Sequence, residues 1–116
     1  MLLIMQKFIK MTLFSILLLT NNAFAENSEL LHANEWSVPK KATTLLAMPA
    51  INKVMKKLQK NVNSSLKIKY PGGDEGTLWA NELRSWLIAL GLSSKRIELI
   101  PGSAVSTIIE LDVLTH

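Results

Sequence analysis

The feature that most constrains the fold is a strand-like alternation that occurs on both sides of a helix-like segment. Residues 66–70 (LKIKY) alternate apolar and charged side chains, which predicts a β-strand with one buried face. Residues 96–100 (RIELI) alternate in the same way. Between them, apolar residues at helical spacing predict a helix over residues 77–90. A strand, a helix and a second strand form a β-α-β unit, whose two strands run parallel.

The remaining segments complete a small α+β domain. Pro49 suits the first turn of a helix, and an apolar stripe at helical spacing follows it. The polar cluster at residues 61–64 predicts that this helix ends there. Residues 36–38 alternate before Pro39, which predicts a short edge strand. A linker is expected at residues 40–44, and a last strand at residues 105–113. Since every strand alternates, the sheet is covered on one side only. We therefore expect a two-layer α/β sandwich: a three- or four-stranded mixed sheet with two helices on one face.

The N-terminal segment has the three parts of a secretory signal peptide. Lys7 and Lys10 form a basic region, a short apolar run follows, and the small-residue pattern Ala23-Phe24-Ala25 closes it. We predict a signal peptide over residues 1–25, cleaved after Ala25, and a periplasmic product without a membrane span. An uncleaved N-terminal anchor is the alternative, but the apolar run is short for a span of about 20 residues.

The predicted product is small and carries no cysteine. Removing 25 of 116 residues leaves 91, which is enough for one domain without disulfides. Residues 26–38 are expected to form an N-terminal arm with the short edge strand, and residues 39–116 the single α/β domain. Eleven basic residues then face nine acidic ones, a net charge of +2, so a nucleic-acid partner is not expected. The charges are unevenly spread: residues 40–69 hold eight lysines and no acid.

No arrangement of residues in the sequence indicates catalysis. The glycine-rich turn at 71–76 lacks the lysine of a phosphate loop, and Asp74 and Glu75 would repel a phosphate. These two acids instead suit the first turn of the following helix, as caps and as partners of its dipole. His32 lies in the predicted N-terminal arm and His116 is the last residue, and two such histidines without a cysteine make a poor metal site. We predict a protein that is not an enzyme and needs no metal or cofactor.

Exposed tryptophans and charged helix faces are the best candidates for an interaction surface. Trp79 and Trp86 lie on one helical face, where they are either core residues or binding anchors. Trp36 precedes the short edge strand and would cover the sheet or meet a partner. The lysines of the first helix lie opposite its apolar stripe, as a solvated face or an anion-docking surface. The predicted interaction candidates are Trp36, Trp79, Trp86, Arg84, Asp74, Glu75, Lys53, Lys56, Lys57 and Lys60.

Several motifs together resemble a known family. The first is the glycine-rich turn with the tyrosine before it, at residues 70–76 (YPGGDEG). The second is the tryptophan-bearing helix at residues 78–91 (LWANELRSWLIALG), and the third is the strand after it, at residues 96–103 (RIELIPGS). This run resembles a family of small exported proteins encoded by integrating conjugative elements, which transfer DNA through a type IV secretion apparatus. The resemblance covers about residues 36–113. It implies a role in conjugation but no active site, and the lysine-rich helix departs from the expected pattern.

A weaker resemblance is to OmpA-like domains that bind peptidoglycan. Those domains also lead from a strand through a Gly- and Asp-bearing loop into a helix, and then to a strand near an Arg-Ile pair, here Arg96-Ile97. However, the stretch from Asp74 to Ala80 is short, and Trp79 stands where that family has its ligand-binding arginine. The resemblance therefore implies shared architecture at most.

These observations lead to two hypotheses of different classes. The first is a non-enzymatic periplasmic accessory protein of a conjugative type IV secretion apparatus, whose partners are other envelope proteins. It would dock through an open sheet edge, an exposed tryptophan or the lysine face. The alternative is an OmpA-like module that binds the peptidoglycan cell wall.

Overall fold

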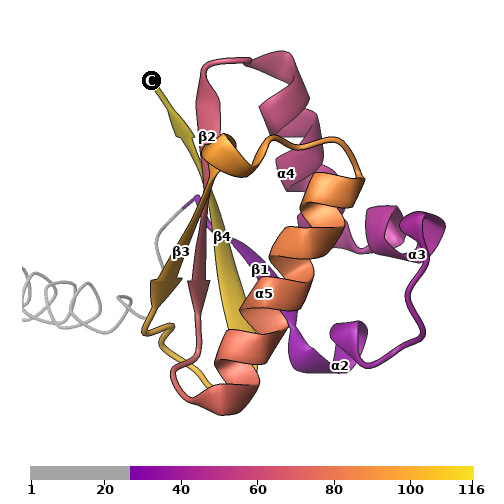
Figure 1. Ribbon diagram of the computed structural model, residues 1–116, viewed down its shortest axis with the longest axis vertical. Helices are drawn as coiled ribbons and strands as arrows, with labels where there is room; N and C mark the ends of the chain where they lie inside the picture. The colour runs from indigo at the N-terminus through magenta and orange to yellow at the C-terminus, as the bar shows by residue number, and fades with distance from the viewer. Residues whose placement is uncertain (1–26) are drawn as a thin grey trace, which may run out of the picture.

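The described part of the chain forms one four-stranded mixed sheet with its helices packed on one face. We analysed a computed structural model, which describes residues 27–116. The strand order is β1-β4-β2-β3, and Figure 1 shows the helices together on one side of this sheet. The strands are β1 (Glu29–His32), β2 (Ser64–Tyr70), β3 (Ile97–Pro101) and β4 (Ile108–Thr115). The predicted two-layer α+β class is confirmed. The predicted signal peptide and its cleavage site lie outside the described residues.

The predicted β-α-β unit is present. Strands β2 and β3 are parallel, and helix α5 (Asp74–Ala89) connects them along the chain. Strand β4 then pairs antiparallel with β2 and with β1, so it lies inside the sheet. In the register, Ile68 lies opposite both Leu99 and Leu111, which places three apolar side chains in one row beneath the helices.

Helix α4 (Pro49–Lys60) also agrees with the sequence prediction. Pro49 occupies its first turn, and its apolar stripe is buried: Ile51 and Val54 are fully inaccessible to solvent. These side chains meet Leu31, Ile68 and Ile109 from the sheet, all fully buried. The core therefore lies between α4, α5 and one face of the sheet, as alternation in the strands requires.

Helix α5 begins three residues earlier than predicted and is seated by a glycine. Gly73, at φ 93°, is its N-cap, so Asp74 and Glu75 lie in the first turn, while no side chain caps the helix. The predicted capping role of these two acids is therefore wrong, although their position suits the helix dipole. Gly76 packs so closely on the preceding turn that a Cβ there would lie 1.8 Å from the Pro71 carbonyl oxygen.

A single arginine closes the opposite end of the helical layer. The Arg96 guanidinium donates hydrogen bonds to the carbonyls of Leu58 (2.9 Å), Asn61 (3.1 Å) and Ser64 (2.8 Å), and to the Ser64 hydroxyl. These carbonyls belong to the last turn of α4, to its C-cap Asn61 and to Ser64, the first residue of β2; the last carbonyls of a helix lack partners within it. Arg96 is the last residue of the short 3₁₀ helix η1 (Ser94–Arg96), so it ties α4 to the start of β3. Sequence reasoning assigned it no such role.

The N-terminal part of the prediction is wrong in detail. The edge strand is β1, not residues 36–38, and Trp36 ends a short helix α2 (Ala33–Trp36). The Ala33 amide donates to the Thr107 carbonyl at 2.9 Å, a contact 74 residues away in the chain that no local pattern reveals. The predicted linker at 40–44 instead leads into helix α3 (Ala42–Ala47), whose Leu45 is buried in the core. Likewise, β4 begins at Ile108 rather than at residue 105.

Candidate functional site

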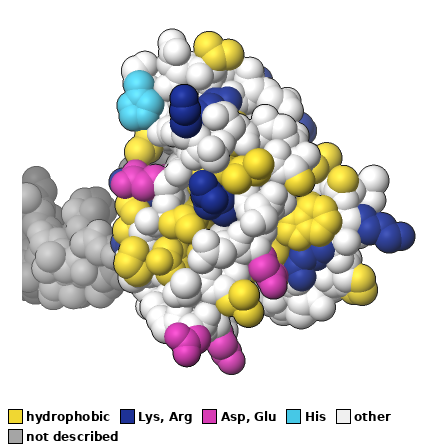
Figure 2. Space-filling view, in the orientation of Figure 1, with side chains coloured by type: hydrophobic (Ala, Val, Ile, Leu, Met, Phe, Trp, Pro, Cys, Tyr) yellow, Lys and Arg dark blue, Asp and Glu magenta, His cyan; other side chains and the backbone are white. Residues whose placement is uncertain are grey.

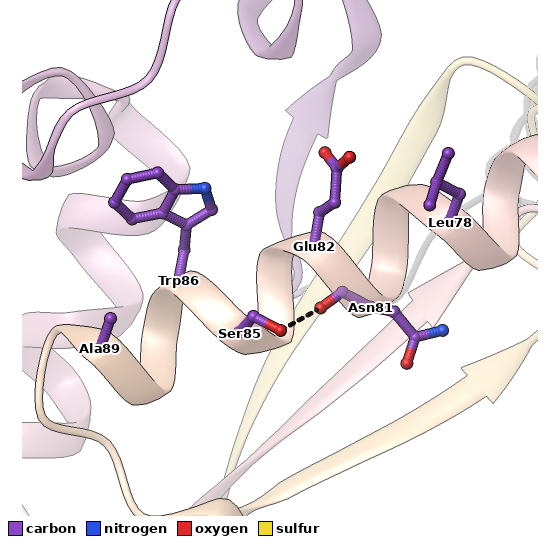
Figure 3. A pocket seen from close by; sticks show the side chains of 6 residues that line it. All are labelled: Leu78, Asn81, Glu82, Ser85, Trp86 and Ala89. Atoms are coloured by element: carbon purple, nitrogen blue, oxygen red, sulfur yellow. Dashed lines mark hydrogen bonds between the residues drawn. The ribbon is translucent and has the colours of Figure 1, made fainter.

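The best candidate site is an open groove on the outer face of α5. Its volume is about 490 Å³, and its lining is predominantly apolar. All six lining residues come from this helix, over three turns: Leu78, Asn81, Glu82, Ser85, Trp86 and Ala89. Figure 3 shows Leu78, Glu82 and Trp86 projecting from the same side of α5.

Two rows of side chains with a helical spacing of four make up the groove. Residues 78, 82 and 86 form a tall row of leucine, glutamate and tryptophan. Residues 81, 85 and 89 form a low row of asparagine, serine and alanine beside it. Side chains four residues apart lie along one ridge of a helix, and the space between adjacent ridges accepts a ridge of a second helix.

The polar side chains of the low row each donate one hydrogen bond to the backbone of α5. The Asn81 amide nitrogen donates to the Thr77 carbonyl at 2.8 Å, and the Ser85 hydroxyl donates to the Asn81 carbonyl at 3.0 Å, drawn in Figure 3. Both bonds turn these groups back onto the helix backbone. Within this row Ala89 offers apolar contact, whereas Asn81 keeps a second amide N–H and its side-chain carbonyl oxygen without a partner among the described residues.

Glu82 is the charged residue of the groove. Its Oε2 accepts a hydrogen bond from the Trp36 indole nitrogen at 3.3 Å. The Trp36 ring in turn has the Lys40 ammonium 4.5 Å from its centroid. No lysine or arginine nitrogen lies within 4.0 Å of the Glu82 carboxylate in residues 27–116. The carboxylate is exposed and open to a cation from a partner.

The three predicted tryptophans have different roles. Trp36 is only 7 % exposed, so of the two roles that the sequence left open, packing favours burial over direct contact with a partner: the ring belongs to the core, beneath Lys40 and beside Glu82. Trp79 is half-buried against the core, and its indole nitrogen has no hydrogen-bond partner among the described residues. Trp86 is half-buried as well, but it lines the groove. Trp86 is therefore the tryptophan best placed to meet a partner.

The other predicted interaction residues on α5, which are Asp74, Glu75 and Arg84, lie outside the groove. Asp74 and Glu75 are exposed at the N-terminal end of the helix, before the groove. Arg84 is half-buried and does not line the groove. It lies two residues from Glu82, and residues two apart on a helix point in nearly opposite directions. Figure 2 shows this face of the molecule, with exposed apolar side chains among acidic and basic ones.

The four predicted lysines lie on α4 and are not part of the groove. Lys53, Lys56, Lys57 and Lys60 are all exposed. Lys53 and Lys57 each approach the Glu29 carboxylate of β1, at 3.7 and 3.5 Å. Half of the lysine face is thus bound to an acid within the fold. The structure does not bring these lysines together with Trp86.

The sheet edges are less suitable as docking surfaces. Strands β1 and β3 are the two outer strands, so each leaves one side without a partner strand among the described residues. However, β1 has four residues, and β3 has five and ends at Pro101, which cannot donate a backbone hydrogen bond. Short edge strands and proline are features that discourage strand addition.

Sequence reasoning missed most of the groove. Leu78 is 62 % exposed, yet in the sequence it looks like another apolar helix residue. Ser85 and Ala89 carry no signal of their own. The regular spacing of 78, 82 and 86 is visible in the sequence, but which side of α5 faces solvent depends on how the helix packs.

Within residues 27–116, no three histidine, cysteine or acidic side chains cluster closely enough to hold a metal ion. None of the helices in the described region combines the length and hydropathy needed to cross a membrane.

Comparison with known proteins adds no further constraint: no protein-family model, curated protein or solved structure matches this chain. The resemblances to conjugative-element proteins and to OmpA-like domains therefore stay predictions from sequence motifs.

Proposed function

We propose that the protein is a non-enzymatic accessory component of a conjugative type IV secretion apparatus, exported to the periplasm, where it binds another envelope protein. The predicted signal peptide and the motif resemblance support the location and the process. The single observation that carries the binding role is the α5 groove, where Leu78 and Trp86 offer apolar surface on either side of an exposed carboxylate.

The shape of the groove favours a protein partner over a small molecule. Sites for small molecules are concave and bury about 70–90 % of the ligand surface. This groove is lined by one helix and is open along its outer side. A small molecule there would stay largely in water, whereas a second polypeptide could cover the whole length of α5.

In-cell crosslinking tests this proposal most directly. A photo-crosslinking amino acid replaces Ser85, at the floor of the groove, in a donor strain, and the captured proteins are identified. A matched strain carries it at Gln59, on the exposed side of α4. We expect position 85, and not position 59, to capture components of the secretion apparatus, and deletion of the gene to lower transfer of the element. Normal transfer in a clean deletion contradicts the proposal.

The cell-wall alternative has a separate test. Asp74 is exposed in the first turn of α5. Trp79, which stands where OmpA-like domains have their ligand-binding arginine, is half-buried against the core. A peptidoglycan module would sediment with purified sacculi, and Asp74→Ala would weaken that binding. If the wild-type protein stays in the supernatant, the alternative fails.

A further inference from the structure

We infer that the α5 groove binds an amphipathic α-helix that has an apolar stripe and at least one lysine or arginine beside it. This inference rests on the proposed function, which takes the groove to be a contact surface. It adds the chemistry of the partner, which neither the sequence motifs nor the family resemblance provides.

The backbone of α5 favours a helical partner over an extended one. An extended peptide on this surface would need partners for its own N–H and C=O groups. In its middle turns, helix α5 uses its backbone groups internally, and one amide donor of Asn81 and the Ser85 hydroxyl are bonded to its own carbonyls. A helix satisfies its own backbone and can lie on an apolar surface without that cost.

The dimensions of the groove define the length of the partner segment. From residue 78 to residue 89 the groove extends about 16 Å along α5, at a rise of 1.5 Å per residue. A partner helix of three turns, with apolar residues at i, i+4 and i+8, would place one ridge between the tall row and the low row. The small side chains of Ser85 and Ala89 let the two helices approach closely.

The acids of α5 favour a cationic partner. Glu82 stands in the middle of the tall row, and Asp74 and Glu75 follow at the N-terminal end. None of these carboxylates has a basic nitrogen within 4.0 Å in the described region. A lysine or arginine beside the partner's apolar stripe would pair with Glu82, whereas an acid there would be repelled.

Helix α4 of a second copy of this chain does not fit the description. The apolar stripe of α4 is buried in the core of its own subunit, with Ile51, Val54 and Leu58 at most 1 % exposed. Its exposed face carries lysines but no leucine, isoleucine or valine. It could meet the charge of Glu82, but it could not fill the apolar part of the groove.

The test uses two synthetic 18-residue helical peptides and the protein purified from the cells that produce it. Both peptides carry the same leucine stripe; one has lysines beside it, and its twin has glutamates at those positions. Binding is followed by fluorescence anisotropy of a label on the peptide. We expect the lysine peptide to bind at least about tenfold more tightly than its twin. Equal binding of the two peptides would overturn the inference.

Variants of the protein locate the contact. Glu82→Lys and Leu78→Asp should each weaken binding of the lysine peptide by about tenfold. Two control variants should change the affinity for the lysine peptide by about twofold or less. Glu98→Lys makes the same charge change at an exposed position on β3, and Ile88→Asp changes an exposed residue of α5 that does not line the groove. Thermal unfolding of each variant checks its fold, and Glu82→Gln provides a milder change. If Glu82→Lys and Glu98→Lys weaken binding equally, the inference is wrong.

Failure of this inference is distinguishable from failure of the proposed function. If position 85 still captures an envelope protein in donor cells while the two peptides bind equally, the groove is a contact surface and the partner chemistry is wrong. If the lysine peptide binds as expected but position 85 captures no apparatus component, the site is correct and the conjugative role is wrong.

Discussion

Helices α4 and α5 cover the same face of the sheet, but they present opposite kinds of surface to solvent. On α4, every long side chain on the outer face is polar, and two of its lysines pair with Glu29. On α5, Leu78 is 62 % exposed and lies in a row with Trp86 and with the Glu82 carboxylate, which has no basic partner within 4.0 Å among the described residues. The requirements of folding explain the first surface completely. They do not explain the second, because exposing leucine gains no stability.

The two helices are also held in place differently. Helix α4 is secured at its C-terminal end, where Arg96 bonds its last carbonyls. Helix α5 is secured at its N-terminal end, where Gly76 packs on Pro71. On the outer face of α5, Glu82 accepts a hydrogen bond from Trp36 and Trp86 packs partly against the core, whereas Leu78 is 62 % exposed. The exposed part of this face is available as a binding surface, and the following predictions test that separation.

The largest effect is expected from Gly76→Ala. The new methyl group would lie 1.8 Å from the Pro71 carbonyl oxygen, so the start of α5 or the preceding turn must move. We expect the free energy of unfolding to fall by about 3 kcal/mol or more, measured by chemical denaturation. Gly72→Ala is the control, because no atom lies within 4 Å of its added Cβ. Equal stability of the two variants would show that the close packing of Gly76 on Pro71 does not hold α5 in place.

Arg96→Ala should give the next largest effect. It removes the hydrogen bonds to Leu58, Asn61 and Ser64 and leaves partly buried carbonyls without a donor. We expect a loss of about 2–3 kcal/mol in the free energy of unfolding. Arg96→Lys should recover only part of it, since an ammonium cannot reach all three carbonyls as the planar guanidinium does. The neighbouring exposed Lys95→Ala is the control; a similar loss there would contradict the role of Arg96.

Leu78→Ser separates binding from stability on α5. Because the leucine is 62 % exposed, we expect the free energy of unfolding to change by no more than about 0.5 kcal/mol. Capture of a partner by the crosslinker at position 85 should nevertheless fall strongly. Leu83→Ser, at a fully buried position of the same helix, is the opposite case and should destabilise the fold by several times as much. Unchanged capture in Leu78→Ser would remove the distinction between the two helices.

The smallest effect is expected from the lysine face of α4. Lys57→Ala removes an ion pair of 3.5 Å whose lysine side chain is 49 % exposed. We expect the free energy of unfolding to change by about 0.5 kcal/mol or less. Crosslinking at position 85 should not change, and Lys56→Ala, which breaks no ion pair among the described residues, serves as the reference. Loss of partner capture in Lys57→Ala would show that α4 contributes to the interaction surface.

Much of the fold could be predicted because its central elements repeat their pattern over enough residues. The alternation in β2 and the apolar stripe of α4 each continue long enough to define one period. The N-terminal elements are shorter: three residues around Trp36 cannot distinguish a strand from one helical turn. That choice depends on the contact between Ala33 and Thr107, which is far away in the chain.

The sequence by itself determined the local periods, the turns between them and therefore the β-α-β unit, because these depend on neighbouring residues. Only the tertiary structure decided which side of each helix stays exposed, since burial depends on what the sheet and the other helices cover. Trp36 and Trp86 demonstrate this: the sequence offers both as anchors, whereas packing buries the first and leaves the second at the edge of the groove. The candidate site is a consequence of packing, and for that reason its residues could be named only after the fold was known.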